Sequence, residues 1–566
     1  MLLTTFLPRV CLPTFLANKA RSPNIVWRNT SGLTGLSLEE HAYFIPLKSD
    51  HRKVTLAASK SFQAERYGGE GLAGNGGGVR CGLDGTFQIK GIGRNLLAGA
   101  ATDFFHSYGG ASLNEGIVEA IWGEVLHAAL PYGAVRIYGL IGTGTRVPLL
   151  IPKEGCDPTT ARALIVRQSA LRPAHYMRSI YYDPITEMHT APKDAVRTRA
   201  AVGSIAIALA SLYESDLETN SAANSGEQLN AYIQQMFARC AAQIACARAK
   251  RIMHGSLIAS NFALDGRWLD FSTSSAMSDY GRILISPGTP DFMHEEQTLQ
   301  RTVFDLNFYL RKYVSKSIAL KLDEPGVVWK EFISQFNLCL ETEFLKLTGI
   351  PIECILKISP AKRSDLYRVM KAIIASGNST SYSILTGAAM PGKTGDFSLN
   401  VILSKSTLCA SRDSLNMELI DVLSNMQLRI DFVEQYWQCR EEYLAQFSNK
   451  DRVSANCFMR LNCLRLNMCL PELYRPHLYE EIDQLIVGAG DVNKYINKKI
   501  KMATTLLAEP VAGEINLSDW FDSAVTVSAA VGIHKSGVAT SMQRLLMSIR
   551  PGILSTQQIQ KMVSYA

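Results

Sequence analysis

The sequence lacks several features that mark common classes of protein. None of its 12 cysteines forms a Cys-x-x-Cys pair or has zinc-ribbon spacing, so neither a zinc ribbon nor a disulfide framework is expected. Lysine and arginine number 58 against 51 acidic residues, an excess too small and too dispersed for a nucleic-acid-binding surface. The longest helical apolar run, 200–212, is shorter than the ~20 residues that cross a bilayer. We therefore expect no nucleic-acid partner and no membrane span.

The N-terminal segment also lacks the pattern of a signal peptide. It is apolar, but it has no basic start, and Pro8 and Pro13 interrupt it. A signal peptide joins a positively charged start to an unbroken apolar stretch. Scattered cysteines are typical of buried thiols in a reducing compartment. We therefore expect a cytoplasmic protein.

The chain does have the residue balance of a globular protein and more than one pattern of hydrophobic spacing. Of its 566 residues, 47% are hydrophobic and 19% are charged, which predicts several compact units. Strand-like runs at 86–89 and 135–141 flank a helical pattern at 112–130. From 297 onward the apolar spacing is helical almost throughout, and it includes one long predicted helix at 414–447.

These changes of pattern divide the chain into four predicted segments. The first is an irregular lead-in, and the second mixes strands with a helix. The third opens a helical unit, and the last is an extension of helices. Their limits are 1–50, 51–166, 167–320 and 321–566.

Eleven glycines crowd the segment 67–94, which reads YGGEGLAGNGGGVRCGLDGTFQIKGIGR. Glycine adopts positive φ at little cost and lets a backbone approach a ligand closely. A loop of this kind can point N–H groups at phosphate oxygens, and Gly76, Gly77 and Gly78 are the candidates. The segment is not a Walker P-loop, because it lacks G-x-x-x-x-G-K-[ST]. A flexible, hairpin-rich stretch is the alternative interpretation.

A lysine and a glutamate follow the glycines in an order that suits phosphate binding. Lys90 closes the strand-like run, and Glu119 lies in the middle of the predicted helix 112–130. A strand lysine can pair with phosphates when a carboxylate from a helix holds it in place. A solvated surface lysine is the alternative for Lys90 taken alone.

The residues His254, Asn261 and Asp270 form the strongest signal of a metal site. Asn261 and Asp270 flank the segment FALDGRWL, in which Asp-Gly predicts a tight hairpin. A hairpin brings its two ends together, and amide and carboxylate oxygens are ligands that Mg²⁺ accepts. We expect His254 to fix the loop by hydrogen bonds. Taken singly, Asn261 is also compatible with a loop amide and Asp270 with a turn cap.

These motifs together resemble the selenoprotein-O family of pseudokinases, which are protein adenylyltransferases. The family has a Tyr-x-Gly-His-Gln-Phe-Gly stretch, a Gly-Gln-Leu-Gly-Asp-Gly-Arg segment, a Leu-Lys-Gly-x-Gly strand end and a His-Gly-x-x-Asn loop followed by Asp-Tyr-Gly. The counterparts here are Tyr67-Gly68-Gly69, Gly74 to Arg80, Ile89 to Gly93, His254-Gly255 with Asn261, and Asp270-Phe271. The resemblance covers 60–310. The family's Arg-Val-Ala-Pro-Ser-His-x-Arg segment is echoed only in VRQSALRPAHYMR.

The resemblance implies an α+β fold with two lobes like those of a protein kinase, followed by a large helical extension. The N-lobe would be 51–166 and the C-lobe 167–320. It also implies ATP and Mg²⁺ or Mn²⁺ as cofactors, with AMP transferred to a hydroxyl of a protein or peptide acceptor. The implied catalytic residues are Lys90, Glu119, Asn261 and Asp270, the last two binding the metal. Nucleotide contacts are expected from Gly76, Gly77, Gly78, Arg80, Lys90, Arg167, Arg172 and Arg178.

One departure from the family pattern keeps other functions open. Ser260 stands where the family has Asp, which removes a negative group near the metal and a proton acceptor. The first alternative is an ATP-using subunit of a peptide-maturation complex, such as a microcin-type modification or ligation, with an enzyme partner subunit. The second is a catalytically weakened scaffold that binds nucleotide and holds a partner through its helical tail.

Overall fold

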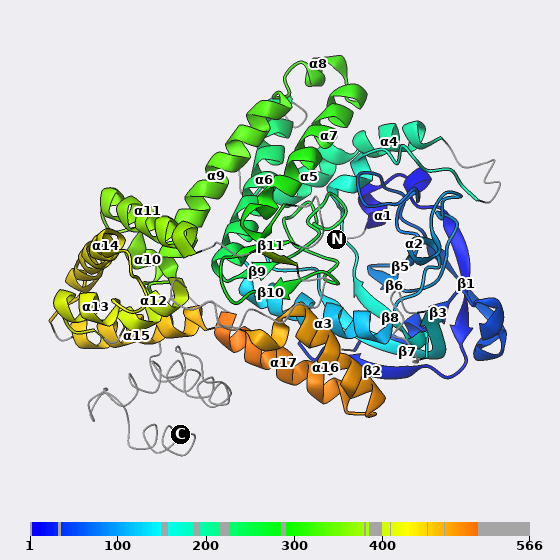
Figure 1. The fold of residues 1–566 in the computed structure, drawn as a ribbon. Helices are drawn as coiled ribbons and strands as arrows, with labels where there is room; N and C mark the ends of the chain where they lie inside the picture. Colours follow the sequence, from blue (N-terminus) through cyan, green and yellow to red (C-terminus); the bar gives the residue numbers. More distant parts are fainter. Residues whose placement is uncertain are drawn as a thin grey trace.

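Eight antiparallel strands form the main sheet of the protein, in the order β2-β7-β8-β6-β5-β4-β1-β3. The computed structural model describes residues 3–31, 35–148, 157–185, 193–215, 226–284, 290–377, 381–383, 399–407, 409–449, 451–468 and 470–507. Figure 1 shows the sheet on one side of the molecule and most of the helices on the other. The strands are β1 Thr14–Ala20, β2 Asn24–Arg28, β3 Tyr43–Phe44, β4 Val54–Gln63, β5 Cys81–Asp84, β6 Phe87–Lys90, β7 Ile137–Pro148 and β8 Thr159–Gln168.

The central strand β8 separates two apolar cores. Ile165 belongs to the core that contains the helices, whereas Leu164 and Val166 belong to a smaller core on the opposite face. Successive side chains of a strand point to opposite faces of a sheet, so this alternation follows from the sequence. Helix α3, Leu113–Ala129, packs on the first face through Ile117 and Ile121.

Helix α3 begins and ends close to the predicted limits of 112–130. The Ser112 hydroxyl accepts a hydrogen bond of 3.1 Å from the N–H of Glu115 and caps the helix. Such a cap satisfies one of the N–H groups that lack a partner in the first helical turn. The helix ends at Ala129, and Pro131 follows two residues later.

Helices make up most of the remaining described residues, together with four short strands. The helices besides α3 are α1 Leu3–Phe6, α2 Phe104–Ser107, α4 Asp194–Val202, α5 Ile205–Tyr213, α6 Gly226–Ala249, α7 Thr298–Tyr313, α8 Lys316–Ala319, α9 Pro325–Lys346, α10 Ile352–Ile355, α11 Pro360–Gly377, α12 Leu399–Ser406, α13 Arg412–Glu418, α14 Met426–Ala445, α15 Arg452–Asn467, α16 Arg475–Val487 and α17 Val492–Leu507. The strands are β9 Ile252–Met253, β10 Ser275–Ala276, β11 Arg282–Leu284 and β12 Ser381–Ser383.

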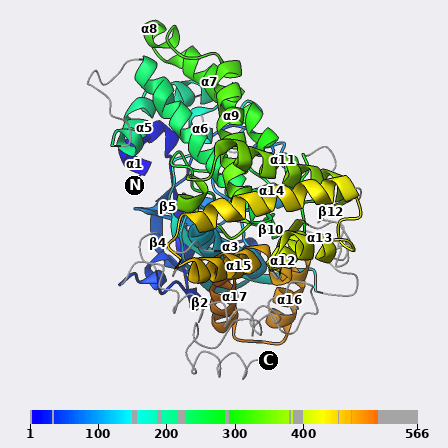
Figure 2. The same ribbon diagram turned by 90° about the vertical axis from the view of Figure 1, so that its left-hand side faces the viewer.

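The helical extension leaves the sheet and then returns to it. Figure 1 shows α10 to α15 grouped at a distance from the sheet, and Figure 2 brings several of these helices to the front. Helices α16 and α17 then come back to lie beside α3. The indole N–H of Trp27 in β2 donates a 3.0 Å hydrogen bond to Asn497 of α17. The described part of the predicted extension 321–566 consists mainly of helices and also contains β12, whereas 508–566 lie outside the described residues.

The structure confirms a mixed α+β architecture and corrects the expectation of an irregular lead-in over 1–50. Strand β1 pairs with β4 from Thr14↔Gln63 to Ala20↔Val54, and β2 pairs with β7. Along β1 the burial of side chains does not alternate strictly. The period of two that identifies a strand in a sequence is therefore weak in this segment.

The predicted single helix at 414–447 is also wrong, because two helices occupy this stretch. Helix α13 ends at Glu418, and α14 begins at Met426. The side chain of Asn425 accepts a 3.0 Å hydrogen bond from the N–H of Leu428 and caps the second helix. Asparagine favours this position over a helix interior, because its side chain competes for backbone hydrogen bonds.

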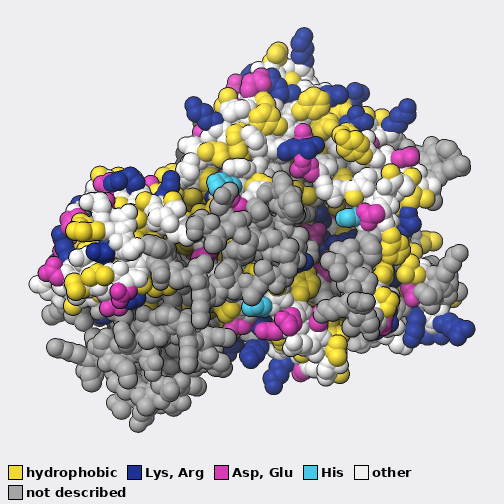
Figure 3. Space-filling model, in the orientation of Figure 1, with side chains coloured by type: hydrophobic (Ala, Val, Ile, Leu, Met, Phe, Trp, Pro, Cys, Tyr) yellow, Lys and Arg dark blue, Asp and Glu magenta, His cyan; other side chains and the backbone are white. Residues whose placement is uncertain are grey.

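One segment among the described residues, Asp194–Tyr213, has the length and apolar composition of a membrane-crossing helix. The structure divides it into α4 and α5 at Gly203 and Ser204. Arg197 of α4 is fully buried and donates hydrogen bonds to the carbonyls of His175 and Met177. These contacts tie the segment to the rest of the fold. On the face shown in Figure 3, acidic and basic side chains are interspersed.

Candidate functional site

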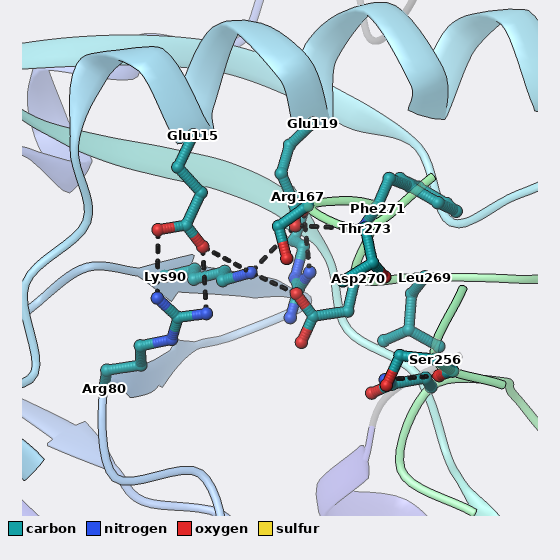
Figure 4. Close-up of polar contacts among 12 residues, drawn as sticks. Arg80, Lys90, Glu115, Glu119, Arg167, Ser256, Leu269, Asp270, Phe271 and Thr273 are labelled. Carbon is teal, nitrogen blue, oxygen red and sulfur yellow. Dashed lines mark hydrogen bonds and ion pairs between the residues drawn. The ribbon is translucent and has the colours of Figure 1, made fainter. Parts of the chain in front are cut away.

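Lys90 lies at the centre of a partly buried cluster of charged side chains (Figure 4). Its neighbour Ile89 packs into the smaller core, so the alternation of β6 turns Lys90 toward α3. Its ammonium nitrogen donates a 2.8 Å hydrogen bond to Oε1 of Glu119 and lies 3.0 Å from Oε1 of Glu115. It also contacts Oδ1 of Asp270. The side chain of Lys90 is only 1% exposed, so these three carboxylates replace solvent around its charge.

Two glutamates of α3 reach this cluster because four residues separate them. Side chains four residues apart lie on one face of a helix, and Figure 4 shows Glu115 and Glu119 pointing from α3 toward Lys90. Oε2 of Glu119 lies 3.2 Å from the guanidinium of Arg167 in β8. Arg80 lies 2.9 Å from Oε1 of Glu115. The cluster therefore sets three carboxylates against three cations.

Burial and the neighbouring charges shift the pKa values of these groups in opposite directions. Burial tends to raise the pKa of Asp270, but the charges of Lys90 and Arg80 outweigh it and hold that pKa well below its ordinary value. Burial tends to lower the pKa of Lys90, but the three carboxylates raise it above its ordinary value. For Glu119, burial dominates and raises the pKa. Glu119 is therefore the carboxylate that takes up a proton first on acidification.

Asn261 and Asp270 lie at the two ends of a hairpin, as the sequence predicts. The N–H of Leu269 donates a 3.0 Å hydrogen bond to the carbonyl of Asn261, and Phe262 and Trp268 form an antiparallel bridge. The turn between them contains Asp265 and Gly266. The hairpin therefore brings Asn261 next to the segment that carries Asp270.

The loop before the hairpin is held by two buried side chains. Nε2 of His254 lies 3.0 Å from the carbonyl of Leu269, and burial lowers the pKa of His254 to about 4, so the ring is neutral and donates through this nitrogen. The carboxylate of Glu295 accepts hydrogen bonds from the N–H groups of Gly255, at 2.6 Å, and of His254, at 3.3 Å. The sequence interpretation of His254 as a residue that fixes the loop agrees with these contacts.

The oxygen ligands at this site fit a small divalent cation. The carboxylate oxygens of Glu115, Glu119 and Asp270 lie within 4.8 Å of one another, and hard oxygen ligands suit Mg²⁺ and Mn²⁺. Lys90 contacts Oδ1 of Asp270, and within the described part of the chain Oδ2 receives no hydrogen bond. Oδ1 of Asn261 accepts only a 3.2 Å hydrogen bond from Ser260 among the described residues. The ammonium of Lys90 lies between the three carboxylates, so Oδ2 of Asp270 and Oδ1 of Asn261 are the oxygens that remain available to a metal.

The predicted arginines lie at separate places around this centre. Arg80 and Arg167 pair with Glu115 and Glu119. Arg172 is buried, donates a 3.0 Å hydrogen bond to the carbonyl of Ser260 and lies over the ring of Tyr67. Only Arg80 and Arg167 therefore belong to the Lys90 cluster.

Arg178 lies in a cleft of about 430 Å³. Residues 69–74, 178–181 and three residues of α7, Arg301, Asp305 and Tyr309, line this cleft. The side chain of Glu70 pairs with Arg301 across it. The structure thus places Arg178 beside the glycine-rich segment and apart from Lys90's carboxylate partners.

The glycines at 76–78 have a structural use within the fold, and their predicted role in phosphate binding stays a prediction. The N–H of Gly76 donates to the carbonyl of Leu97, at 2.8 Å, and that of Gly78 to the carbonyl of Glu65, at 2.9 Å. At Gly77, φ is +141°, and a Cβ atom would lie 2.2 Å from the carbonyl oxygen of Glu65. Two of the three expected N–H donors are therefore engaged by the backbone, and the glycines allow two chain segments to approach closely.

Two residues of the site were not selected from the sequence. Glu115 was one of several acidic residues in its helix, and its spacing of four from Glu119 was the available signal. Glu295 lies in the 3₁₀ helix Phe292–Gln297, beyond any recognised motif.

The comparisons with known proteins add no further residue: the chain matches no model of a protein family, and no curated protein matches it significantly.

Proposed function

We propose that this protein binds ATP with Mg²⁺ or Mn²⁺ at the Lys90 cluster, in a kinase-like site, and transfers AMP to a hydroxyl of a protein or peptide. The observation that carries the proposal is the meeting of Lys90, Glu119 and Asp270, which come from β6, α3 and the hairpin. A strand lysine held by a helix glutamate, next to a metal-binding aspartate, is the arrangement that positions phosphates in kinase-like proteins. The motif resemblance to selenoprotein-O pseudokinases selects AMP transfer within this class.

The proposed reaction forms one bond and breaks one bond at the α-phosphorus of ATP. The acceptor hydroxyl oxygen attacks this phosphorus, and the bond to the bridging oxygen of the β-phosphate breaks. The products are the AMP-modified acceptor and pyrophosphate, and the hydroxyl proton passes to an oxygen of the departing pyrophosphate. Positioning and charge stabilisation carry most of the catalysis in such transfers. Lys90, Arg80 and the metal held by Asp270 and Asn261 would supply the positive charge.

Ser260 shapes the proposed chemistry, because it stands next to Asn261 without offering a carboxylate. Its hydroxyl donates a 3.2 Å hydrogen bond to Oδ1 of Asn261, and it is 7% exposed. A serine hydroxyl is a poor proton acceptor at neutral pH. In the proposed reaction, the proton of the substrate hydroxyl therefore passes to the phosphate oxygens rather than to Ser260.

A second candidate function, nucleotide binding without transfer, is favoured by the balance of charge at the site. Lys90, Arg80 and Arg167 compensate the three carboxylates without a metal. A cluster whose charges already balance gains less electrostatic stabilisation from binding a divalent cation. Such a protein would act as a scaffold that binds nucleotide and holds a partner through its helical tail.

Incubation with ATP labelled at the α-phosphate, Mg²⁺ or Mn²⁺ and candidate acceptors separates the two functions. AMP transfer predicts labelled protein and released pyrophosphate, and both should be lost in Asp270→Asn. Asp265→Asn in the turn of the same hairpin is the matched control, because Asp265 pairs only with its neighbour Arg267 among the described ion pairs. Binding of ATP with no labelled product in any reaction would favour the scaffold.

A further inference from the structure

The carbonyl of Ser272, two residues after Asp270, accepts two hydrogen bonds from the helical extension. Nε of Arg475 lies 2.9 Å from it, and the hydroxyl of Tyr479 lies 3.1 Å from it. The two residues are four apart on α16 and therefore share one helix face. The guanidinium of Arg475 also lies 4.7 Å from the ring centre of Tyr479, so each side chain restricts the other.

A third contact fixes the other end of this short segment. The N–H of Arg475, at the start of α16, donates a 3.0 Å hydrogen bond to the hydroxyl of Ser275. N–H groups in the first turn of a helix have no partner within the helix, and this one is used to hold β10. Ser275 in turn pairs with Met253, the residue before His254. Helix α16 thus contacts the segment after Asp270 directly, and it reaches the strand that enters the loop of Asn261 only through Ser275.

The same helix also holds the beginning of α3. The side chain of Asn114 donates a hydrogen bond to Asp483 of α16 and accepts one of 3.2 Å from Thr160 of β8. Asn114 directly precedes Glu115. Helix α16 therefore links the two elements that supply the three carboxylates, while the N–H of Phe271 joins them directly through a 3.1 Å hydrogen bond to Glu119.

The backbone of Asp270 requires such support. Its φ is +71°, a value that is uncommon for residues other than glycine and that persists only when the surroundings fix it. Burial raises the pKa of Tyr479 to about 12, so its hydroxyl keeps its proton and remains a donor over the physiological range.

We propose that Arg475 and Tyr479 are positioning residues, which hold Asp270 in its metal-binding conformation through the carbonyl of Ser272. Calling Asp270 a metal ligand rests on the proposed function, whereas its fixation by α16 does not. Residues more than 200 positions away along the chain would thereby set the metal affinity of the site. The helical extension is then a component of the site and not an independent unit.

The test compares Tyr479→Phe with Tyr495→Phe. The hydroxyl of Tyr495 in α17 donates a 2.8 Å hydrogen bond to Glu481 of α16. This control therefore also removes one tyrosine hydrogen bond made with α16, but not one made to the segment after Asp270. Arg475→Lys is a second variant that keeps the charge but loses the planar group over Tyr479. Amide hydrogen exchange at 271–275 is measured without ligand, and Mn²⁺ affinity in the presence of ATP is measured by electron paramagnetic resonance.

We expect Tyr479→Phe and Arg475→Lys to speed exchange at 271–275 and to weaken Mn²⁺ binding by roughly 2- to 12-fold, the fold-change that corresponds to one hydrogen bond. Tyr495→Phe should change neither quantity. Unchanged exchange at 271–275 in both site variants, or an equal effect of Tyr495→Phe, would overturn the proposal. If the wild-type protein binds no Mn²⁺ with ATP, the proposed function fails, and the exchange measurement still decides whether α16 positions this segment.

Discussion

The ammonium nitrogen of Lys90 lies 2.8 Å from Oε1 of Glu119, and this pair joins the central sheet to helix α3. Both side chains are removed from solvent, with exposures of 1% and 0%. A buried charge without its partner is strongly destabilising, because no water compensates it. The pair therefore affects both the stability of the fold and the state of the site, and several measurable consequences follow from it.

Replacement of Glu119 by Gln should destabilise the protein substantially. The change leaves Lys90 and Arg167 with one compensating charge fewer, and breaking a buried pair costs ~3–5 kcal/mol in unfolding free energy. Denaturant unfolding measures this loss. Glu227→Gln is the control, because Glu227 is 73% exposed in its pair with Lys321, and such surface pairs contribute ~0–1 kcal/mol. Equal effects of the two substitutions would contradict the burial of the cluster.

Replacement of Lys90 by Met should change the contribution of this cluster to the pH dependence of stability. In the wild type, the pKa values of Asp270 and Glu115 are lowered on folding, so their stabilisation is present above ordinary carboxyl pKa values and is lost as pH falls through the folded ones. Without Lys90, the remaining carboxylates repel one another and their folded pKa values rise. The variant should then gain stability, relative to wild type, as pH falls from 7 to about 5. Thermal unfolding of both proteins across this range checks whether the variant gains stability relative to wild type. A difference in stability that does not change with pH would refute the prediction.

Glu295 should make the stability of the wild-type protein fall between pH 5 and 8. Burial raises its pKa to about 7, above the value of a carboxyl in an unfolded chain. The folded protein then binds more protons in this window than the unfolded chain, so stability declines as pH rises through it, by on the order of 3 kcal/mol. Glu295→Gln cannot ionise, and its unfolding free energy should vary less with pH. A variant that keeps the wild-type slope would show that Glu295 does not titrate in this window.

Gly77→Ala should be far more damaging than Gly85→Ala. Both glycines have positive φ, of +141° and +63°, but only Gly77 would place its Cβ against a backbone carbonyl. Nothing lies within 4 Å of the Cβ position of Gly85, so that change carries only the backbone strain of ~1–2 kcal/mol. In urea unfolding, we expect Gly77→Ala to lose clearly more unfolding free energy than Gly85→Ala. Similar losses in the two variants would contradict the close approach of residue 77 to Glu65.

The sequence was informative wherever short-range patterns determine the structure. The strand-like run placed Lys90 at its end, the helical pattern at 112–130 placed Glu119 in the middle of a helix, and Asp265-Gly266 located the hairpin. Each of these depends on neighbours within a few residues. The candidate pair of Lys90 and Glu119 could therefore be named before the fold was known.

Long-range contacts could not be predicted in the same way. The pairing of β1 with β4 and the contact of Tyr479 with Ser272 join segments whose local sequences carry no sign of one another. The use of Gly76 and Gly78 is a related case, because a glycine permits close approach without specifying whether a phosphate or another strand will approach. Tertiary packing decided the outcome at each of these positions.

The most direct test of the central claim is a calorimetric titration of the protein with ATP and Mg²⁺. If Lys90, Glu119 and Asp270 form one nucleotide and metal site, the wild-type protein and Asp265→Asn should bind with the same affinity. Asp270→Asn should lose most of the binding that depends on Mg²⁺. Absence of ATP binding by the wild type, or unchanged Mg²⁺-dependent binding by Asp270→Asn, would contradict the account.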